Sequence, residues 1–360
     1  TGTGQATPVG LTNVSPQVNH SATANLSSTL SATVFNEVRL SYGRQFAGTN
    51  AEKPEIAQRI PSIEVVDLGL TGFNASSART GIGLAANLPS FGTLNNYQFQ
   101  EAVSVLRGSH SMKFGIDFRR QEQFSFFVPN IRGQLEYASL QTLINDQATR
   151  GQVQGPLTGG EAMTYMRYND YFFYLQDEWR IRPNFTLSYG VRYESPGNPI
   201  QNLANVNQRV VAANGNDERY RLTPVPARDK NNWAPRLGFN YRFGQAPGLL
   251  GWATGNGKLV LRGGYSRTYD VAFNNIGLNV STSFPAVYLY QVPFVGTTIP
   301  NAFPQIQSFV AGVRPPIANP GLLTRTIVAQ DFRAPLAEQY SVQLQRELAG
   351  GFAFTMGYIG

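Results

Sequence analysis

The chain has 360 residues, of which 42% are hydrophobic and only 14% are charged, and it contains no cysteine. Soluble domains usually have about a quarter of their residues charged, so this composition is unusual for one. The lack of cysteine excludes a disulfide framework, a thiolate metal site and a cysteine nucleophile. The net charge of +7 comes from basic residues scattered singly along the chain. Nucleic-acid binding needs a basic helix or stripe, so we do not expect nucleic acid as a partner.

The N-terminal quarter is predicted to contain little regular structure. Residues 1–30 are rich in Ser, Thr, Asn and Gly, which is typical of a loop. Residues 33–45 alternate between two faces, and a period of two residues indicates a β-strand. Residues 46–96 contain clusters of Gly, Asn, Pro and Ser, so we expect a long loop with one short strand over residues 63–68.

A β-hairpin is predicted over residues 97–127, with its turn at residues 107–110. Its two arms carry apolar residues that meet on one face when the arms are paired about this turn. The predicted cross-strand pairs are Val105 with Met112, Val103 with Phe114, and Phe99 with Phe118. Residues 128–167 then form a long connection, in which we expect a short helix near residues 140–146.

The most regular alternation lies in residues 168–194, which we predict to be a second hairpin. Pairing Trp179 with Leu187 and Ile181 with Phe185 places the apolar residues of both arms on the same face. Each arm has roughly 10 residues, which is enough for a tilted strand to cross a bilayer. Aromatic residues gather towards the ends of the apolar faces, as in the interface girdle of a membrane β-barrel.

The C-terminal part repeats the pattern of strands and loops. A polar loop extends to about residue 235, and a second Pro-, Asn- and Gly-containing loop covers residues 270–335. The predicted strands are residues 236–243, 258–269, 340–348 and 352–358, with a further short strand at residues 287–292.

Long and short connections alternate along the chain, as they do in an outer-membrane barrel with tight turns on one side and long loops on the other. The fold class predicted is therefore all-β, a transmembrane antiparallel β-barrel. About nine strands are predicted, whereas bacterial barrels usually close with an even number. We therefore expect missed strands, an incomplete wall, or both. An incomplete wall exposes two strand edges, so we expect the isolated chain to aggregate.

Four blocks resemble the barrel region of TonB-dependent outer-membrane receptors, specifically the Oar-like branch. Their order and spacing carry the resemblance, and together they cover under a third of the chain. The blocks are NNYQFQEAVSVLRGSHSMKFGIDFRR (95–120), YFFYLQDEWRIRPNFTLSYGVRYE (171–194), NNWAPRLGFNYRF with GNGKLVLRGGYSRTYD (231–270), and RAPLAEQYSVQLQRELAGGFAFTMGYIG (333–360).

The resemblance implies a 22-stranded barrel closed by an N-terminal plug and driven by TonB with ExbB and ExbD. No plug, TonB box or closing C-terminal strand is recognisable in the sequence. We therefore expect residues 1–360 to be part of one barrel domain, with these three parts outside this chain. The family has no fixed substrate-binding motif, so no binding residue is inferred from it.

Charged residues on the polar faces of the predicted strands are the candidate substrate or plug contacts. A hydrated barrel interior would tolerate the same charges without any such role. These candidates are Glu37, Arg39, Asp117, Arg119, Glu178, Arg180, Arg192, Arg236 and Arg262, with Arg267 out of phase and expected near a rim. Adjacent opposite charges such as Glu178 and Arg180 are expected to form ladder pairs. Asp177 lies in phase with the apolar face, so we expect it at headgroup level or at a bulge.

No motif for catalysis or cofactor binding is convincing, so we expect neither an enzyme nor a bound cofactor or metal. His20 and His110 are the only histidines, which makes a histidine-based triad or metal site improbable. Gly81, Gly83 and Ala86 have dinucleotide-like spacing but lack a strand–turn–helix context. Gly255-Asn256-Gly257-Lys258 does not complete a phosphate-binding loop.

The predicted function is TonB-dependent transport of an unidentified bulky substrate across the bacterial outer membrane, with membrane lipid as the surroundings. A passive porin or structural barrel is the alternative within membrane proteins. A secreted β-rich binding or adhesion protein is the alternative outside them, and it requires the aromatic face to pack against another sheet. A hydrolase on an all-β scaffold is the least favoured, because no acid–base pair converges.

Overall fold

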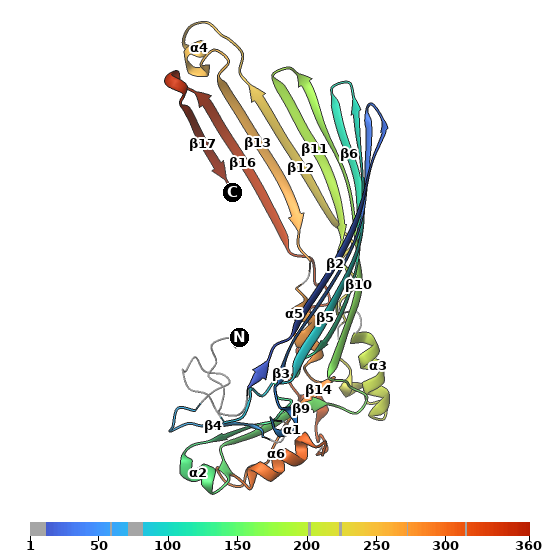
Figure 1. Cartoon of the computed structure of the whole chain (residues 1–360), viewed down its shortest axis with the longest axis vertical. Helices are drawn as coiled ribbons and strands as arrows, with labels where there is room; N and C mark the ends of the chain where they lie inside the picture. The colour runs from blue at the N-terminus through green and yellow to red at the C-terminus, as the bar shows by residue number, and fades with distance from the viewer. Residues whose placement is uncertain are drawn as a thin grey trace.

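The computed structural model describes residues 12–57, 60–70, 82–200, 203–222, 225–271, 273–313 and 315–360. A tall antiparallel sheet, the wall, forms one part of the molecule, and a smaller region of short strands and helices lies at one end of it (Figure 1). We call this smaller region the cap. No helix in these residues is long and apolar enough to cross a membrane.

The wall is an 11-stranded sheet in which neighbouring strands are almost always neighbours in sequence. Its order is β1-β3-β5-β6-β10-β11-β12-β13-β16-β17, and β2 pairs with β3. The strands are β1 (Asn13–Val14), β2 (Gln17–Ser31), β3 (Val34–Ala51), β5 (Ser90–Arg107), β6 (His110–Phe126), β10 (Met163–Arg182), β11 (Phe185–Ser195), β12 (Asn232–Arg242), β13 (Leu259–Tyr269), β16 (Leu336–Glu347) and β17 (Ala353–Ile359). In the part of the chain described, the wall is open, with β2 and β17 at its edges.

The predicted hairpin registers are largely confirmed. Val105 pairs with Met112, as predicted from the turn at residues 107–110. In the β10–β11 hairpin Trp179 pairs with Leu187, also as predicted. The predicted pairing of Ile181 with Phe185 is wrong, because a bulge at Ile181 brings Arg182 opposite Phe185.

The expected loop over residues 1–30 is wrong for residues 17–30, which belong to β2 and pair along most of β3. The alternation of β2 is weak because its outward positions include Ala22 and Ala24, and its inward positions are small and polar. Short Ser, Thr and Ala side chains resemble loop composition even where the backbone is fully paired. With β2 included, ten long strands cross the wall, which removes the odd count.

Side chains of each wall strand alternate between an outward and an inward face. The outward face is apolar and aromatic, and nothing in the described residues covers it. Its members include Phe114 (40% exposed), Phe173 (42%), Leu175 (45%), Leu237 (53%) and Val342 (52%). The inward face is mainly polar. A secreted sandwich would need a second sheet on the aromatic face, and none packs there in the residues that the structure describes.

Acidic residues interrupt the outward face at several positions, and Asp177 and Glu101 are two of them. Asp177 follows the regular register opposite Tyr189, so the bulge considered for it is absent. Its carboxylate accepts hydrogen bonds from Nδ1 of His110 (2.6 Å) and from the hydroxyl of Tyr189 (2.8 Å). The His110 ring stacks on Trp179, with centroids 5.2 Å apart. Glu101 pairs with Ile116 in the middle of the apolar band, a position that the sequence analysis did not single out.

All long connections lie at the end of the wall where the cap is found, and all tight turns lie at the other end (Figure 1). The cap consists of α1 (Pro54–Ala57), β4 (Ser62–Val65), β7 (Gln134–Tyr137), α2 (Leu140–Ile144), β8 (Gln147–Ala148), β9 (Arg150–Pro156), α3 (Leu203–Ala213), η1 (Glu218–Tyr220), α5 (Asn274–Ser281), β14 (Val287–Gln291), β15 (Ile299–Pro300), α6 (Ala302–Val310) and η2 (Pro320–Leu322). The short elements at the tight-turn end are α4 (Gly248–Thr254) and η3 (Ala349–Gly351).

The cap has a shared hydrophobic core to which four long connections contribute. In chain order, these connections join β3 to β5, β6 to β10, β11 to β12, and β13 to β16. A sheet in the order β14-β9-β7-β4 combines strands from three of them. Its core includes Val65 from the first connection, Leu135 from the second and Ile306 from the fourth, each at 0% exposure. Tyr220 of the third connection packs against the same core. The predicted short helix and two short strands in these connections are confirmed as α2, β4 and β14, whereas the shared core was not predicted.

Helix α6 is held in the cap by the packing of its apolar face and by a hydrogen bond at its N-terminus. Ala302, Ile306 and Phe309 are spaced along one face of the helix and are buried in the core. At the helix start, the carboxylate of Asp146 accepts the backbone N–H of Phe303, at 3.1 Å from each oxygen. The same carboxylate accepts a 2.6 Å hydrogen bond from the Tyr137 hydroxyl. Asp146 therefore joins β7 to α6.

Replacing Tyr137 by Phe should make the cap less sensitive to alkali. Burial of Tyr137, and then its hydrogen bond to Asp146, raise the pKa of its phenol above the ordinary value. A raised pKa in the folded state contributes stability that is complete below the pKa of about 10 of an unfolded tyrosine. That contribution is lost as the pH rises above about 10. Limited proteolysis of the full-length protein at pH 8 to 11 measures cap opening, and equal pH dependence of both proteins would contradict this assignment.

Candidate functional site

The nine predicted charged residues all lie on the inward face of the wall. They are Glu37 and Arg39 on β3, Asp117 and Arg119 on β6, Glu178 and Arg180 on β10, Arg192 on β11, Arg236 on β12 and Arg262 on β13. Arg267, expected near a rim of the inward face, instead faces outward and pairs with Glu338 at 2.5 Å. Its position follows from the strict alternation of β13, in which Arg262 is inward.

Several inward charges pair with a residue two positions away on the same strand. Arg119 contacts Asp117 at 2.7 Å, and Arg39 contacts Glu37 at 2.9 Å. Asp117 is buried and also accepts hydrogen bonds from Gln98 (2.9 Å) and, by its other oxygen, from Gln100. These contacts satisfy the carboxylate within the wall, which favours a structural role for this part of the inward face.

The ring of Phe172 contacts two arginines of the inward face, and this residue was not among the predicted candidates. Its ring lies 5.2 Å from the guanidinium of Arg119 and 4.8 Å from that of Arg192. Arg192 in turn contacts Glu194 at 2.8 Å. Phe172 is on the inward face of β10 and is only 4% exposed. The ladder pair predicted for residues 178 and 180 is not among the ion pairs of the described residues.

Two of the predicted charges border a shallow hollow of about 430 Å³ on the inward face. Glu178 and Arg236 lie at its rim. Its floor is formed by glycines on three neighbouring strands, which remove side chains from the surface and leave space there. These glycines are Gly190, Gly238 and Gly264.

A larger cavity of about 1340 Å³ lies between the inward face of the wall and α5, close to the cap. We call it the vestibule. Twelve of its 22 lining residues in the described chain are Asn, Gln, Ser or Thr, and none is charged or a histidine. Strands β1, β2, β3, β5 and β6 supply one side and residues 273–279 the other. This cavity could not be predicted from the sequence, because it joins segments more than 100 residues apart.

A hydrogen-bond network fixes α5 against the wall at the edge of the vestibule. Nδ2 of Asn274 donates to Oε1 of Gln123 at 2.7 Å. The Tyr168 hydroxyl lies 2.7 Å from Oδ1 of Asn274 and 3.0 Å from Oε1 of Gln121. Gln121 also donates to Asp170, which is fully buried. The cavity wall is therefore held in place by groups that are already paired.

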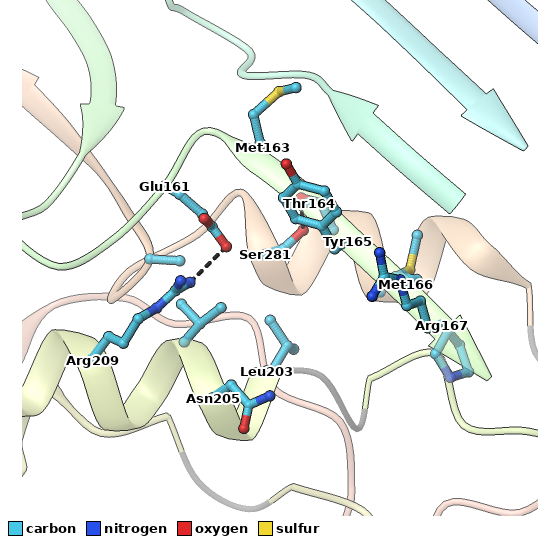
Figure 2. A pocket seen from close by; sticks show the side chains of 14 residues that line it. Glu161, Met163, Thr164, Tyr165, Met166, Arg167, Leu203, Asn205, Arg209 and Ser281 are labelled. Atoms are coloured by element: carbon cyan, nitrogen blue, oxygen red, sulfur yellow. Dashed lines mark hydrogen bonds and ion pairs between the residues drawn. The ribbon is translucent and has the colours of Figure 1, made fainter. Parts of the chain in front are cut away.

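A smaller pocket of about 340 Å³ lies where β10 meets α3 and α5 (Figure 2). Figure 2 shows Glu161 and Arg209 pointing towards each other across it, with 2.6 Å between their charged atoms. The hydroxyls of Thr164 and Ser281 are 2.8 Å apart. The ion pair lies at one side of the pocket. Because its volume is about a quarter of that of the vestibule, this pocket suits a smaller ligand.

The motifs considered in the sequence can be followed only where the structure describes their residues. In the described residues, no group of three or more His, Asp or Glu could hold a metal ion. Gly81 lies outside the described residues, and Gly83 and Ala86 are not followed by a helix. Lys258, considered for a phosphate loop, instead pairs with Glu347 at 2.7 Å.

An antiparallel sheet with an apolar outer face and a polar inner face has the pattern of a membrane β-barrel wall. A family model described as the outer membrane beta barrel domain matches residues 1–360, and the chain belongs to this family. No curated protein sequence matches the chain.

Solved structures of outer-membrane proteins are similar to the chain. The outer membrane transporter YddB from Escherichia coli is 12% identical with a TM-score of 0.51, over 95% of this chain and 34% of that one. The ferric-catecholate import receptor Fiu from E. coli K12 is 10% identical (TM-score 0.41), over 96% of this chain and 40% of that one. The siderophore receptor PirA from Pseudomonas aeruginosa is 10% identical (TM-score 0.36), over 95% and 45%.

The chain thus spans about a third of the length of the transporter YddB. At these identities the likeness shows the fold alone. The family locates the protein in the bacterial outer membrane. The outward face of the wall therefore faces membrane lipid.

Proposed function

We propose that the full-length protein is a TonB-dependent receptor of the Oar-like branch that transports a bulky substrate across the outer membrane. In this proposal residues 1–360 are part of one 22-stranded barrel domain. The plug, the TonB box and the closing strand are supplied by the rest of the protein, and TonB with ExbB and ExbD provides the energy. The cap faces the outside of the cell, because long connections of such barrels are extracellular.

The observation that carries the proposal is the vestibule beneath a cap built from four connections. A cap with its own hydrophobic core can present a fixed surface to a ligand, and the vestibule leads from it onto the inward face. The nine inward charges and the hollow beside Glu178 and Arg236 then lie along the path that a substrate or a plug would contact.

A passive porin is the second candidate, and the position of α5 favours it. This helix belongs to a long connection that folds inward, and Asn274 at its start is fixed to the wall strand β6. Inward-folded connections of this kind narrow the opening of a passive pore. A plug fixed inside the barrel would exclude free diffusion and decide against this candidate.

The proposal predicts that substrate uptake by the full-length protein depends on the energy-coupling complex. Uptake should be lost when tonB is deleted, although the protein still reaches the outer membrane and shows a heat-dependent shift in gel mobility. The shift reports a closed barrel and controls for folding. Unchanged uptake in the deletion strain would support the passive pore, and the absence of a shift would contradict a closed barrel.

A further inference from the structure

We infer that the vestibule binds a neutral, hydroxyl-rich molecule of the oligosaccharide class. This inference rests on the proposed transport function and names the class of its substrate. The electrostatics of the lining favour a neutral ligand. None of the vestibule's lining residues in the described chain carries a charge, whereas ion-paired and unpaired charges are common on the inward face further from the cap. Anionic ligands are recognised by charge-assisted hydrogen bonds, and no side chain that lines the vestibule in the described chain can supply one.

The hydrogen-bonding groups of the lining match those of a sugar. Amide side chains offer donors and acceptors together, and hydroxyl groups do the same. A sugar hydroxyl also donates and accepts, so each contact can be satisfied in both directions. The residues available on α5 are Asn275 and Asn279, which lie one helical turn apart and are exposed. Gln17 and Gln45 face them from the wall strands that line the opposite side.

The vestibule also contains an exposed aromatic ring. Phe273 immediately precedes α5, lines the vestibule and is 70% exposed. An apolar ring face covers the C–H face of a sugar ring while the hydroxyls point to polar groups at its edge. An exposed phenylalanine beside amides therefore suits a ring-shaped polar ligand better than a purely apolar or a charged one.

The site is formed before the ligand arrives. Asn274 is fixed by Gln123 and Tyr168, so the start of α5 does not have to be ordered on binding. The cavity volume of about 1340 Å³ exceeds the roughly 300–1,000 Å³ of sites for drug-sized ligands. The vestibule is therefore large enough for several linked sugar rings.

The test is titration calorimetry of the full-length protein in detergent with maltohexaose, cellohexaose and xylohexaose, and with a ferric tricatecholate complex as the anionic probe. We expect at least one neutral hexasaccharide to bind, with an affinity that hardly changes with salt. Phe273→Ala should weaken this binding at least about tenfold. Phe294→Ala is the matched control, because Phe294 is also exposed (55%) and belongs to the same connection but does not line the vestibule.

The heat-dependent shift in gel mobility confirms that each variant is folded. Failure of all three hexasaccharides to bind, or equal effects of Phe273→Ala and Phe294→Ala, would overturn the inference. Binding of the ferric complex alone would overturn it too, yet leave the proposed transport function intact. Sugar binding combined with uptake that does not need TonB would support the inference and contradict energised transport.

Discussion

Replacing Ile306 by Ala is expected to lower the free energy of cap unfolding by about 2–5 kcal/mol. Ile306 is completely buried in α6, in the core that all four long connections share. Truncation removes apolar contacts and leaves a cavity, which the surrounding strands can fill only in part. Because the strands of the cap sheet come from different connections, the loss at one helix should loosen all of them.

Hydrogen exchange of the full-length protein measures this effect strand by strand. Amides of β4, β7, β9 and β14 should lose protection together, while those of the wall remain protected. Ile144→Ala is the matched control, because Ile144 also belongs to the cap but is 69% exposed. Its effect should be within about 0.5 kcal/mol. Loss of protection confined to the strands from a single connection would show that the cap is not one cooperative unit.

Replacing Asp177 by Ala is expected to destabilise the wall by about 1–3 kcal/mol, although it removes a carboxylate from the lipid-facing side. The substitution leaves the His110 nitrogen and the Tyr189 hydroxyl without their shared acceptor. It also loosens His110, whose ring stacks on Trp179. The side chain of Asp177 is only 9% exposed, so water cannot replace it at these hydrogen bonds without rearrangement.

Urea unfolding of the full-length protein in lipid vesicles, followed by tryptophan fluorescence, tests this prediction. Asp177→Asn should be milder, because the amide retains an acceptor oxygen. Glu178→Ala is the control, since Glu178 is the next residue and is exposed on the inward face. A more stable Asp177→Ala protein would contradict the prediction. It would mean that a carboxylate on the lipid-facing side destabilises the wall by more than its hydrogen bonds stabilise it.

The wall could be predicted from the sequence because its signals are local. Strict alternation and a short turn fix a hairpin register, so the pairing of Trp179 with Leu187 followed from residues 168–194 alone. The bulge at Ile181 could not be predicted, since it depends on how the turn is accommodated. Strand β2 was missed because many residues on both of its faces are small or polar, so the hydrophobicity of successive residues differs little. The structure nevertheless pairs nearly all of β2 with β3.

The candidate site was predictable only in part, for a related reason. Alternation assigns a face, so the inward positions of residues such as Arg119 and Arg236 were correctly predicted, while their contact with substrate stays a prediction. Phe172 looked like one aromatic residue among many until Arg119 and Arg192 were seen on its ring. The vestibule and the cap core depend on residues from distant connections, and no short-range pattern reports such contacts.

The shared core of the cap restricts how this protein can acquire a new specificity. In a receptor whose loops are independent, one loop can be exchanged between relatives while the others stay unchanged. Here Val65, Leu135 and Ile306 come from three connections and fill one another's space. A graft of a single connection would leave its former partners uncovered, so natural variation and engineering must replace the connections as a matched set.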